Sequence, residues 1–212
     1  MAFNPTRKQF KAIKAVLFVA ALLPFLRLVL FTFTDRLGAN PIEFITRSTG
    51  DWTLYFLIFT LAVTPLRKLL NWAWLLRLRR MLGLYAFFYV CLHFMCFFWF
   101  DHNFDLQEMW KDVLKRPFIT VGFTAFVLLI PLAVTSTNAM VKRLGYKRWQ
   151  ALHRLVYLIA CLGVLHFVWM RAGKNNFGDP ILYGSIIAVL LLMRLWWAIA
   201  RRRQPASAAP SA

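Results

Sequence analysis

Long apolar runs alternate with short polar segments along the whole chain. Six such runs cover residues 15–33, 52–66, 81–100, 117–140, 148–171 and 181–200. A helix needs about 20 apolar residues to cross the hydrocarbon core of a bilayer, and most of these runs reach that length. The shorter second run is expected to continue to Leu70, with Arg67 and Lys68 directing their charged ends to the interface. The pattern predicts an all-α integral membrane protein, a bundle of six transmembrane helices over residues 15–203.

The segments outside the runs are expected to be tails and short connections. Residues 1–14 form a basic tail, and residues 204–212 are small, Pro-containing and predicted to be disordered. Polar loops are expected at residues 34–51 and 101–116, and a short capped helix in TSTNAMVKRLG that ends at Gly145. The first run is too long for a signal peptide and lacks a clear cleavage site, so it is predicted to remain as a helix.

The composition and charge agree with a membrane protein. Apolar residues make up 60% of the chain, against about 45–50% in soluble domains. The net charge is +18, but the basic residues gather in the two tails and in alternate connections. The positive-inside rule and the attraction of anionic lipid headgroups account for this charge, so nucleic-acid binding is not expected. The same rule predicts that the N and C termini are both cytoplasmic.

Three histidines lie within apolar runs, where ionisable side chains are costly and usually functional. The helical rise of about 1.5 Å per residue places His153 near the cytoplasmic face and His166 about 20 Å farther along the same helix. Of these two, His166 is the closer in depth to His93 of the third run. The histidines of the fifth run also point about 140° apart around the axis, so two cofactors on this helix would need a tilt or a bend. Ordinary solvation explains His102, beside Asp101.

The three intramembrane histidines favour haem b as a ligand. A porphyrin needs an apolar slot between helices, and neutral imidazoles supply its axial bonds. A zinc or di-metal site would need acidic or clustered cysteine ligands, and no Asp or Glu lies within the six runs. The chain has no CxxCH motif, which argues against a covalently attached c-type haem. The remaining alternative for each histidine is a structural bond to a backbone carbonyl.

Several arginines are candidate partners for the acidic groups of a cofactor, because guanidinium groups bind carboxylates and phosphates in a bidentate manner. Four of them suit haem propionates or an anionic flavin phosphate on the cytoplasmic side, although charge at the inner leaflet explains them equally: Arg77, Arg79, Arg80 and Arg154. Arg27 lies well inside the first run. It either reaches outward to the interface or pairs with the propionates of a haem nearer the periplasm.

Four sequence segments, taken together, resemble the ferric-reductase-like transmembrane domain. They are RRMLGLYAFFYVCLHF, LAVTSTNAM, LGYKRWQALHRLVYL and CLGVLH. Over nearly the whole chain, the sequence is similar to the haem-binding membrane subunits of bacterial periplasmic methionine sulfoxide reductase systems. The resemblance implies an inner-membrane haem b protein in which His93, His153 and His166 occupy haem-ligand positions. It also implies an electron-transfer subunit rather than the catalytic subunit.

The same resemblance implies partners on both sides of the membrane. Electrons would come from a quinol or from a cytoplasmic flavin reductase with FMN. They would pass to a periplasmic molybdopterin-containing subunit that reduces methionine sulfoxide in oxidised proteins.

The sequence departs from the larger ferric reductases in two ways. Its third run has one histidine, His93, and no FAD/NADPH domain follows the sixth run. One haem is therefore expected, and a second would need a shared or unusual ligand. Two other functions remain open: a stand-alone ferric or quinone reductase, and a cofactor-free transporter or structural membrane subunit. Transporters commonly use intramembrane carboxylates or broken helix pairs, which the sequence does not show.

Overall fold

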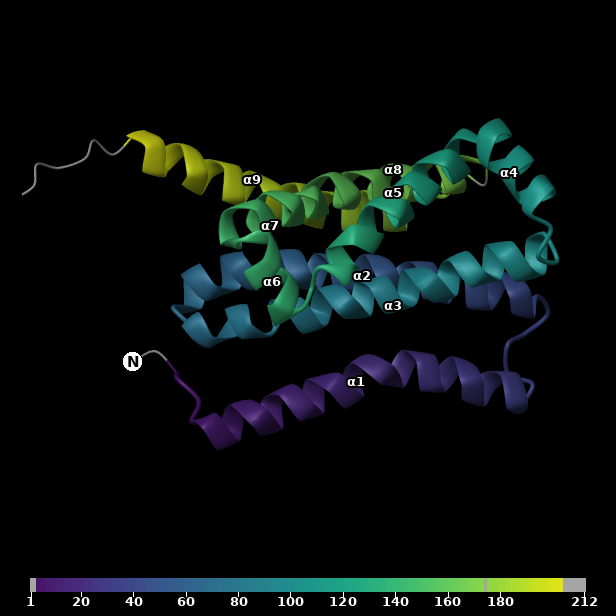
Figure 1. Cartoon of the computed structure of the whole chain (residues 1–212). Coiled ribbons are helices and arrows are strands. Elements are labelled where there is room, and N and C mark those ends of the chain that lie inside the picture. Colours follow the sequence, from purple (N-terminus) through teal and green to yellow (C-terminus); the bar gives the residue numbers. More distant parts are fainter. Residues whose placement is uncertain (1–2, 174, 204–212) are drawn as a thin grey trace, which may run out of the picture.

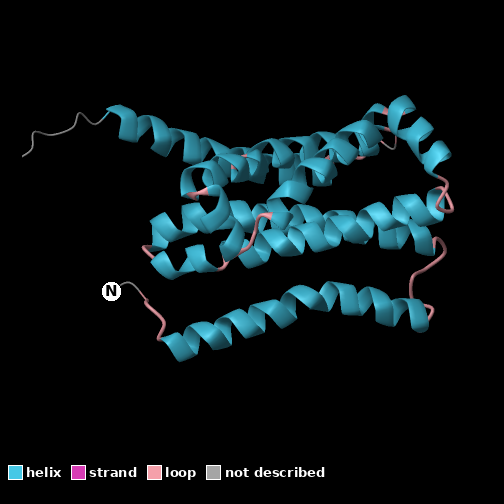
Figure 2. Ribbon diagram, viewed as in Figure 1, coloured by secondary structure: helices cyan, strands magenta, loops and turns pink. Residues whose placement is uncertain are grey.

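A computed structural model describes residues 3–173 and 175–203, and this part of the chain is a bundle of helices (Figure 1, Figure 2). The long helices are α1 (Arg7–Phe33), α2 (Pro41–Leu70), α3 (Arg79–Cys96), α5 (Pro117–Val134), α8 (Leu155–Ala172) and α9 (Gly178–Arg203). The shorter elements are η1 (Ala73–Arg77), the π-helical turn η2 (Phe97–Asp101), α4 (Leu106–Lys115), α6 (Asn138–Leu144) and α7 (Tyr146–His153). Within the described residues, 6 helices are long and apolar enough to cross a membrane, with η2 continuing α3 and α7 preceding α8. The predicted six-helix membrane fold is confirmed.

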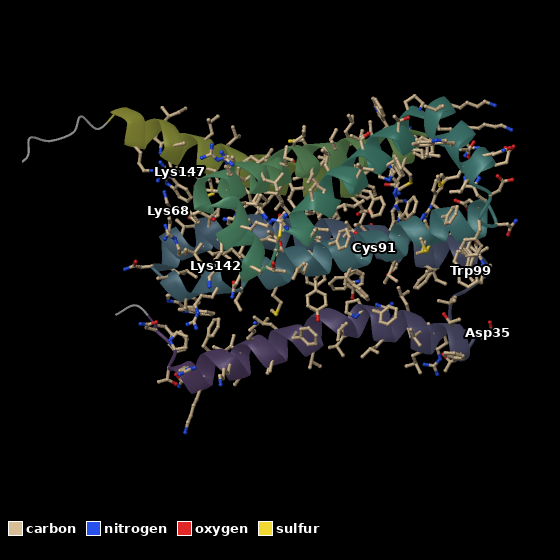
Figure 3. All side chains as sticks on the ribbon, in the orientation of Figure 1. Asp35, Lys68, Cys91, Trp99, Lys142 and Lys147 are labelled. Carbon is tan, nitrogen blue, oxygen red and sulfur yellow. The ribbon has the colours of Figure 1, made fainter. Side chains whose placement is uncertain are left out.

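The two ends of the bundle differ in charge. Lys68, Lys142 and Lys147 gather at one end, which we call the basic end (Figure 3). Asp35 and Trp99 lie at the other, here called the opposite end. This separation matches the alternation of basic and near-neutral connections in the sequence.

Helix α2 begins much earlier than its hydrophobic run. The Asn40 side chain accepts a hydrogen bond from the Glu43 amide at 3.2 Å, and Pro41 occupies the first helical turn. Both features favour the start of a helix. The expected polar loop over residues 34–51 is therefore wrong from residue 41 onward. The additional turns place three charged side chains one helical turn apart, namely Glu43, Arg47 and Asp51.

A short amphipathic helix, α4, occupies most of the second expected loop, residues 101–116. Asp105 caps its first turn by accepting hydrogen bonds from two backbone amides. Met109 and Val113 are buried on its inner face. The polar residues of this segment thus cover the opposite end of the bundle as a helix rather than as a loop.

The remaining boundaries follow local capping signals. Helix α6 is the short helix expected in TSTNAMVKRLG, with Thr137 at its N-cap and Gly145 directly after it. The fifth predicted helix is not continuous, because a turn at Arg154 separates α7 from α8. Helix α1 starts at Arg7, so part of the basic tail is helical. The predicted disordered tail, residues 204–212, lies outside the described residues.

The core lies between α2, α3, α5 and α8, with α2 packed along α3 and α5 packed along α8. Tyr89 is fully buried there, and its ring stacks on that of Phe56 with 5.4 Å between the ring centroids. By contrast, α1 and α9 expose apolar side chains such as Val16 and Leu192 on their outer faces. Exposed apolar faces are expected of helices that are surrounded by lipid.

Tyrosine hydroxyls of α3 attach α1 to the bundle. The Tyr89 hydroxyl donates to the carbonyl oxygen of Ala21 at 2.8 Å and accepts from the amide of Phe25 at 3.2 Å. In a regular helix these two backbone groups bond to each other. The hydroxyl therefore enters the hydrogen-bond ladder of α1 beside Pro24, and Figure 1 shows that α1 is bent along its length.

Candidate functional site

His93 of α3 and His166 of α8 face each other inside the bundle. Their ring centroids are 6.1 Å apart and the ring planes are inclined at 79°. Two imidazoles that bind one metal ion from opposite sides have centres roughly 6 Å apart. Each metal–nitrogen bond is about 2 Å, and each nitrogen lies about 1 Å from its ring centre. The spacing thus fits a single metal ion between the two rings.

Backbone carbonyls fix the orientation of both rings. The Nδ1 atom of His93 lies 2.9 Å from the carbonyl oxygen of Thr46 in α2, and Nδ1 of His166 lies 2.7 Å from that of Phe118 in α5. A carbonyl oxygen only accepts hydrogen bonds, so each Nδ1 carries the proton. Each Nε2 then has a free lone pair, which is the arrangement of a metal-binding histidine held by a second hydrogen bond.

Two glycines allow the neighbouring helices to approach the histidines. A Cβ atom on Gly122 of α5 would lie 2.7 Å from Nδ1 of His166. A Cβ atom on Gly50 of α2 would lie 3.1 Å from Cε1 of His93. The sequence carries a signal for this site, because an isolated glycine within a helical run often marks a close packing contact.

A cavity of about 880 Å³ lies between α2, α3, α5 and α8, and both histidines line it. This volume lies within the range of about 300–1,000 Å³ that is typical of small-molecule and cofactor sites. Most of its wall is apolar or aromatic and includes Leu54, Leu57, Phe94, Phe118, Phe126 and Leu129. Within the described residues, no group of three His, Cys, Asp or Glu side chains is placed to hold a metal ion. The donor set is therefore two neutral imidazoles in an apolar slot, which fits haem.

Comparison with known proteins identifies the family. Residues 49–164 match the family model described as ferric reductase like transmembrane component. A relative from Herminiimonas arsenicoxydans, named protein-methionine-sulfoxide reductase heme-binding subunit MsrQ, is 71% identical over 95% of this chain and 93% of its own length. Proteins with the same name from Ralstonia nicotianae and Bordetella pertussis are 57% and 54% identical, over 95% and 93% of this chain and 93% and 95% of their own lengths. The chain belongs to the MsrQ family. Together with the six spans, this makes it a multi-pass protein of the bacterial inner membrane.

His153 lies apart from the histidine pair in this MsrQ family member. It ends α7, and its Nε2 atom lies 3.0 Å from the Thr135 hydroxyl. Its ring packs on Trp149 with 4.1 Å between centroids, and the Trp149 indole N–H donates to the Thr135 carbonyl oxygen at 2.9 Å. His153 does not line the large cavity. The structure thus brings together two of the three predicted ligand positions, and it places the third in a separate hydrogen-bonded group.

None of the five arginines proposed from the sequence lines the cavity of this MsrQ family member. Arg77 packs over the Phe10 ring at 3.8 Å, and Arg80 donates to the Asn138 side chain at 2.7 Å. Arg79 is half-buried near His153, and Arg154 is exposed. Arg27 packs over the Phe31 ring at 4.9 Å and lines a second hollow, of about 490 Å³, between α1 and α2. This hollow adjoins the histidine cavity, because the two share Asn40, Glu43, Arg47 and Asp51.

Three other arginines line the histidine cavity, namely Arg47, Arg116 and Arg171. The sequence did not single them out, because Arg47 and Arg116 fall in the expected polar loops at residues 34–51 and 101–116 and Arg171 falls at the end of the fifth run. A signal existed for Arg171, since it is the last residue of the run that contains His166.

Proposed function

We propose that this chain holds one haem b between His93 and His166 and carries electrons across the inner membrane. The observation that carries the proposal is the pair of facing imidazoles, 6.1 Å apart, in which both Nδ1 atoms are bonded to backbone carbonyls. The names of the relatives, which describe heme-binding subunits, agree with it.

The residues of the chain have defined tasks in this proposal. Haem supplies an iron couple that takes up and releases one electron. The Nε2 atoms of His93 and His166 would hold the iron, while the carbonyl oxygens of Thr46 and Phe118 keep the rings in one tautomer and orientation. The apolar wall of the cavity keeps water from the metal and thereby influences its reduction potential.

We infer that the chain is the electron-transfer subunit of a methionine sulfoxide reductase system and not its catalytic subunit. In this assignment a quinol or a cytoplasmic flavin reductase with FMN donates electrons, and a periplasmic molybdopterin-containing reductase accepts them. The charge difference between the ends of the bundle supports this orientation in the membrane, since the basic end should be cytoplasmic. Electrons from a cytoplasmic donor would then enter at the basic end and leave at the opposite end. Both termini are then cytoplasmic.

A second redox centre at His153 has weaker support. Its Nε2 atom is engaged with the Thr135 hydroxyl, so metal binding through that nitrogen requires this hydrogen bond to break. No other histidine in the described part of the chain is in ring contact with His153. The geometry therefore favours one haem per chain.

The test is the reduced-minus-oxidised absorption spectrum of purified protein, with haem quantified per chain. We expect a b-type signal of one haem that is lost in His93→Ala and in His166→Ala. His153→Ala is the matched control, since it removes an equivalent imidazole outside the cavity and should retain the signal. A colourless wild-type protein, or a b-type signal that persists in both His93→Ala and His166→Ala, would overturn the proposal.

A further inference from the structure

At the opposite end of the bundle, the lining of the histidine cavity is polar, whereas the interior of the cavity is apolar. Charged side chains from α2, η2, α4 and α8 line this mouth: Glu43, Arg47, Asp51, Asp101, Asp112, Arg116 and Arg171. The interior is lined by residues such as Leu57, Leu129 and Ile159. A ligand that fills this cavity must therefore be apolar over most of its surface and charged along one edge.

Arg171 differs from the other two arginines of the mouth. Its side chain is only 11% exposed, and its Nε atom is buried without a hydrogen-bond partner. The side chain of Arg116 is 57% exposed and lies 3.5 Å from Asp112, while that of Arg47 is 32% exposed and is paired with Glu43 on the next turn. A buried cation is costly unless an anion pairs with it, so Arg171 needs a counterion more than its neighbours do.

Two carboxylates of the protein lie near Arg171, those of Asp179 and Asp51, and neither makes a hydrogen bond to its Nε–H group. Asp179 at the start of α9 lies 3.8 Å from a terminal nitrogen of Arg171, which is beyond hydrogen-bond distance, and its side chain is 55% exposed. The guanidinium also lies 5.5 Å from the Phe167 ring centroid. Neither contact satisfies the Nε–H group. The bidentate edge of the guanidinium therefore remains available to a carboxylate in the cavity.

We propose that Arg171 binds a carboxylate of the haem, so that the propionate edge lies at the polar mouth and the apolar edge lies in the interior. The inference rests on the proposed haem site. His166 and Arg171 belong to the same helix, where five residues separate them by about 7.5 Å along the axis and about 140° around it. Both residues nevertheless line the cavity, so the Arg171 side chain reaches the wall of the slot from another side of the helix. One rigid helix thus carries an iron ligand and a carboxylate partner, which fixes how the macrocycle enters the slot.

Arg171 is a positioning residue in this arrangement, and its charge also acts on the iron. A nearby fixed cation stabilises the reduced form, which carries one positive charge less than the oxidised form. Loss of the cation should therefore lower the midpoint potential of the haem. It should also weaken the preference of the cavity for a porphyrin with free carboxylates.

The test compares haem with haem dimethyl ester, in which both carboxylates are esterified. Full-length protein from haem-deficient cells, in detergent, is titrated with each porphyrin, and the ratio of the two affinities is the readout. We expect wild-type protein to prefer haem by about tenfold or more, because esterification removes the charged acceptor of the Arg171 hydrogen bonds. Arg171→Leu should bring the ratio close to one and lower the midpoint potential. Arg171→Lys, which keeps the charge without the planar fork, should give an intermediate ratio.

Arg36→Leu is the matched control, since Arg36 is exposed and lines neither hollow, so its ratio should equal that of the wild type. Asp179→Asn tests whether Arg171 acts only through its ion pair, and it should retain the preference for haem. An unchanged ratio in Arg171→Leu, with the b-type spectrum intact, would overturn this inference alone. A wild-type protein that binds neither porphyrin would overturn the proposed haem site, and this inference with it.

Discussion

The guanidinium of Arg194 in α9 donates a hydrogen bond to the carbonyl oxygen of Leu61 in α2. That carbonyl would normally accept from the amide four residues later, but the residue there is Pro65, which has no N–H. Arg194 also donates to the Tyr157 hydroxyl of α8 at 3.2 Å. The charge within the sixth apolar run therefore has a structural explanation: it satisfies a carbonyl that proline leaves unpaired and joins three helices.

A double-mutant cycle tests this relationship. Arg194→Leu should lower the free energy of unfolding by about 1–3 kcal/mol, because it leaves the buried Leu61 carbonyl without a partner. In a Pro65→Ala background the same change should cost less, since the new amide at position 65 can bond to that carbonyl. Thermal unfolding of the four proteins in one detergent measures the coupling. Arg201→Leu, an exposed arginine on the same helix, is the control, and strictly additive effects would contradict the explanation.

The Tyr89 hydroxyl should stabilise α1 more than the Tyr85 hydroxyl does. Tyr89 bridges an amide and a carbonyl of α1, whereas the Tyr85 hydroxyl makes one bond, to the Phe18 carbonyl oxygen at 2.8 Å. We expect Tyr89→Phe to destabilise the protein by about 1 kcal/mol and to increase amide hydrogen exchange around Pro24. Tyr85→Phe is a matched control, because it also removes one tyrosine hydroxyl but leaves the Tyr89 bridge between Ala21 and Phe25 intact. Equal exchange in the two variants would show that the bridge does not stabilise α1.

The sidedness of the bundle can be measured with cysteine labelling in intact cells. Arg36→Cys places a thiol in the exposed segment at the opposite end, and Lys142→Cys places one at the basic end. A membrane-impermeant maleimide added outside the inner membrane should label Arg36→Cys and not Lys142→Cys. Both should react once the membrane is permeabilised. The native cysteines, Cys91, Cys96 and Cys161, lie within membrane spans, so wild-type protein provides the background. The reverse labelling pattern would place the basic end in the periplasm.

Hydrophobic length determined what could be predicted about the fold. A bilayer requires long apolar helices, so the spans are visible in the sequence even where their ends are not. The early start of α2 was missed because Glu43, Arg47 and Asp51 are polar, although they form helical turns beyond the apolar run. Hydropathy gives the part of a helix that lies in lipid, whereas the complete helix depends on caps such as that of Asn40.

The depth of the site residues was also predictable, but their lateral placement was not. Axial rise alone indicated that His93 lies closer in depth to His166 than to His153, and the structure shows the first two in ring contact. Which arginines line the same cavity depends on how four helices rotate and pack, and a single sequence does not reveal that. Arg27 therefore looked like a partner for an outer haem, while Arg171 forms part of the cavity wall.

The glycines beside the histidines give the most local test of the site. A Cβ atom on Gly122 would lie 2.7 Å from His166 Nδ1, the atom that bonds to the Phe118 carbonyl oxygen. Gly122→Ala must therefore displace the ring or the helix, at a cost of about 1–3 kcal/mol. We expect it to lower haem content sharply, and Gly50→Ala, where the nearest contact is 3.1 Å, to lower it less.

Gly83→Ala is the matched control for these two variants, because its Cβ atom would meet only a Thr60 methyl group at 3.9 Å. It exchanges the same residue types within a membrane helix, and it should leave both haem content and the absorption spectrum unchanged. Haem per chain and the reduced-minus-oxidised spectrum are measured for all three proteins. If Gly122→Ala retained a full complement of haem with the wild-type spectrum, His166 could not hold the iron in the position that the structure gives it. If Gly83→Ala lost haem as well, the effect would come from helix packing in general.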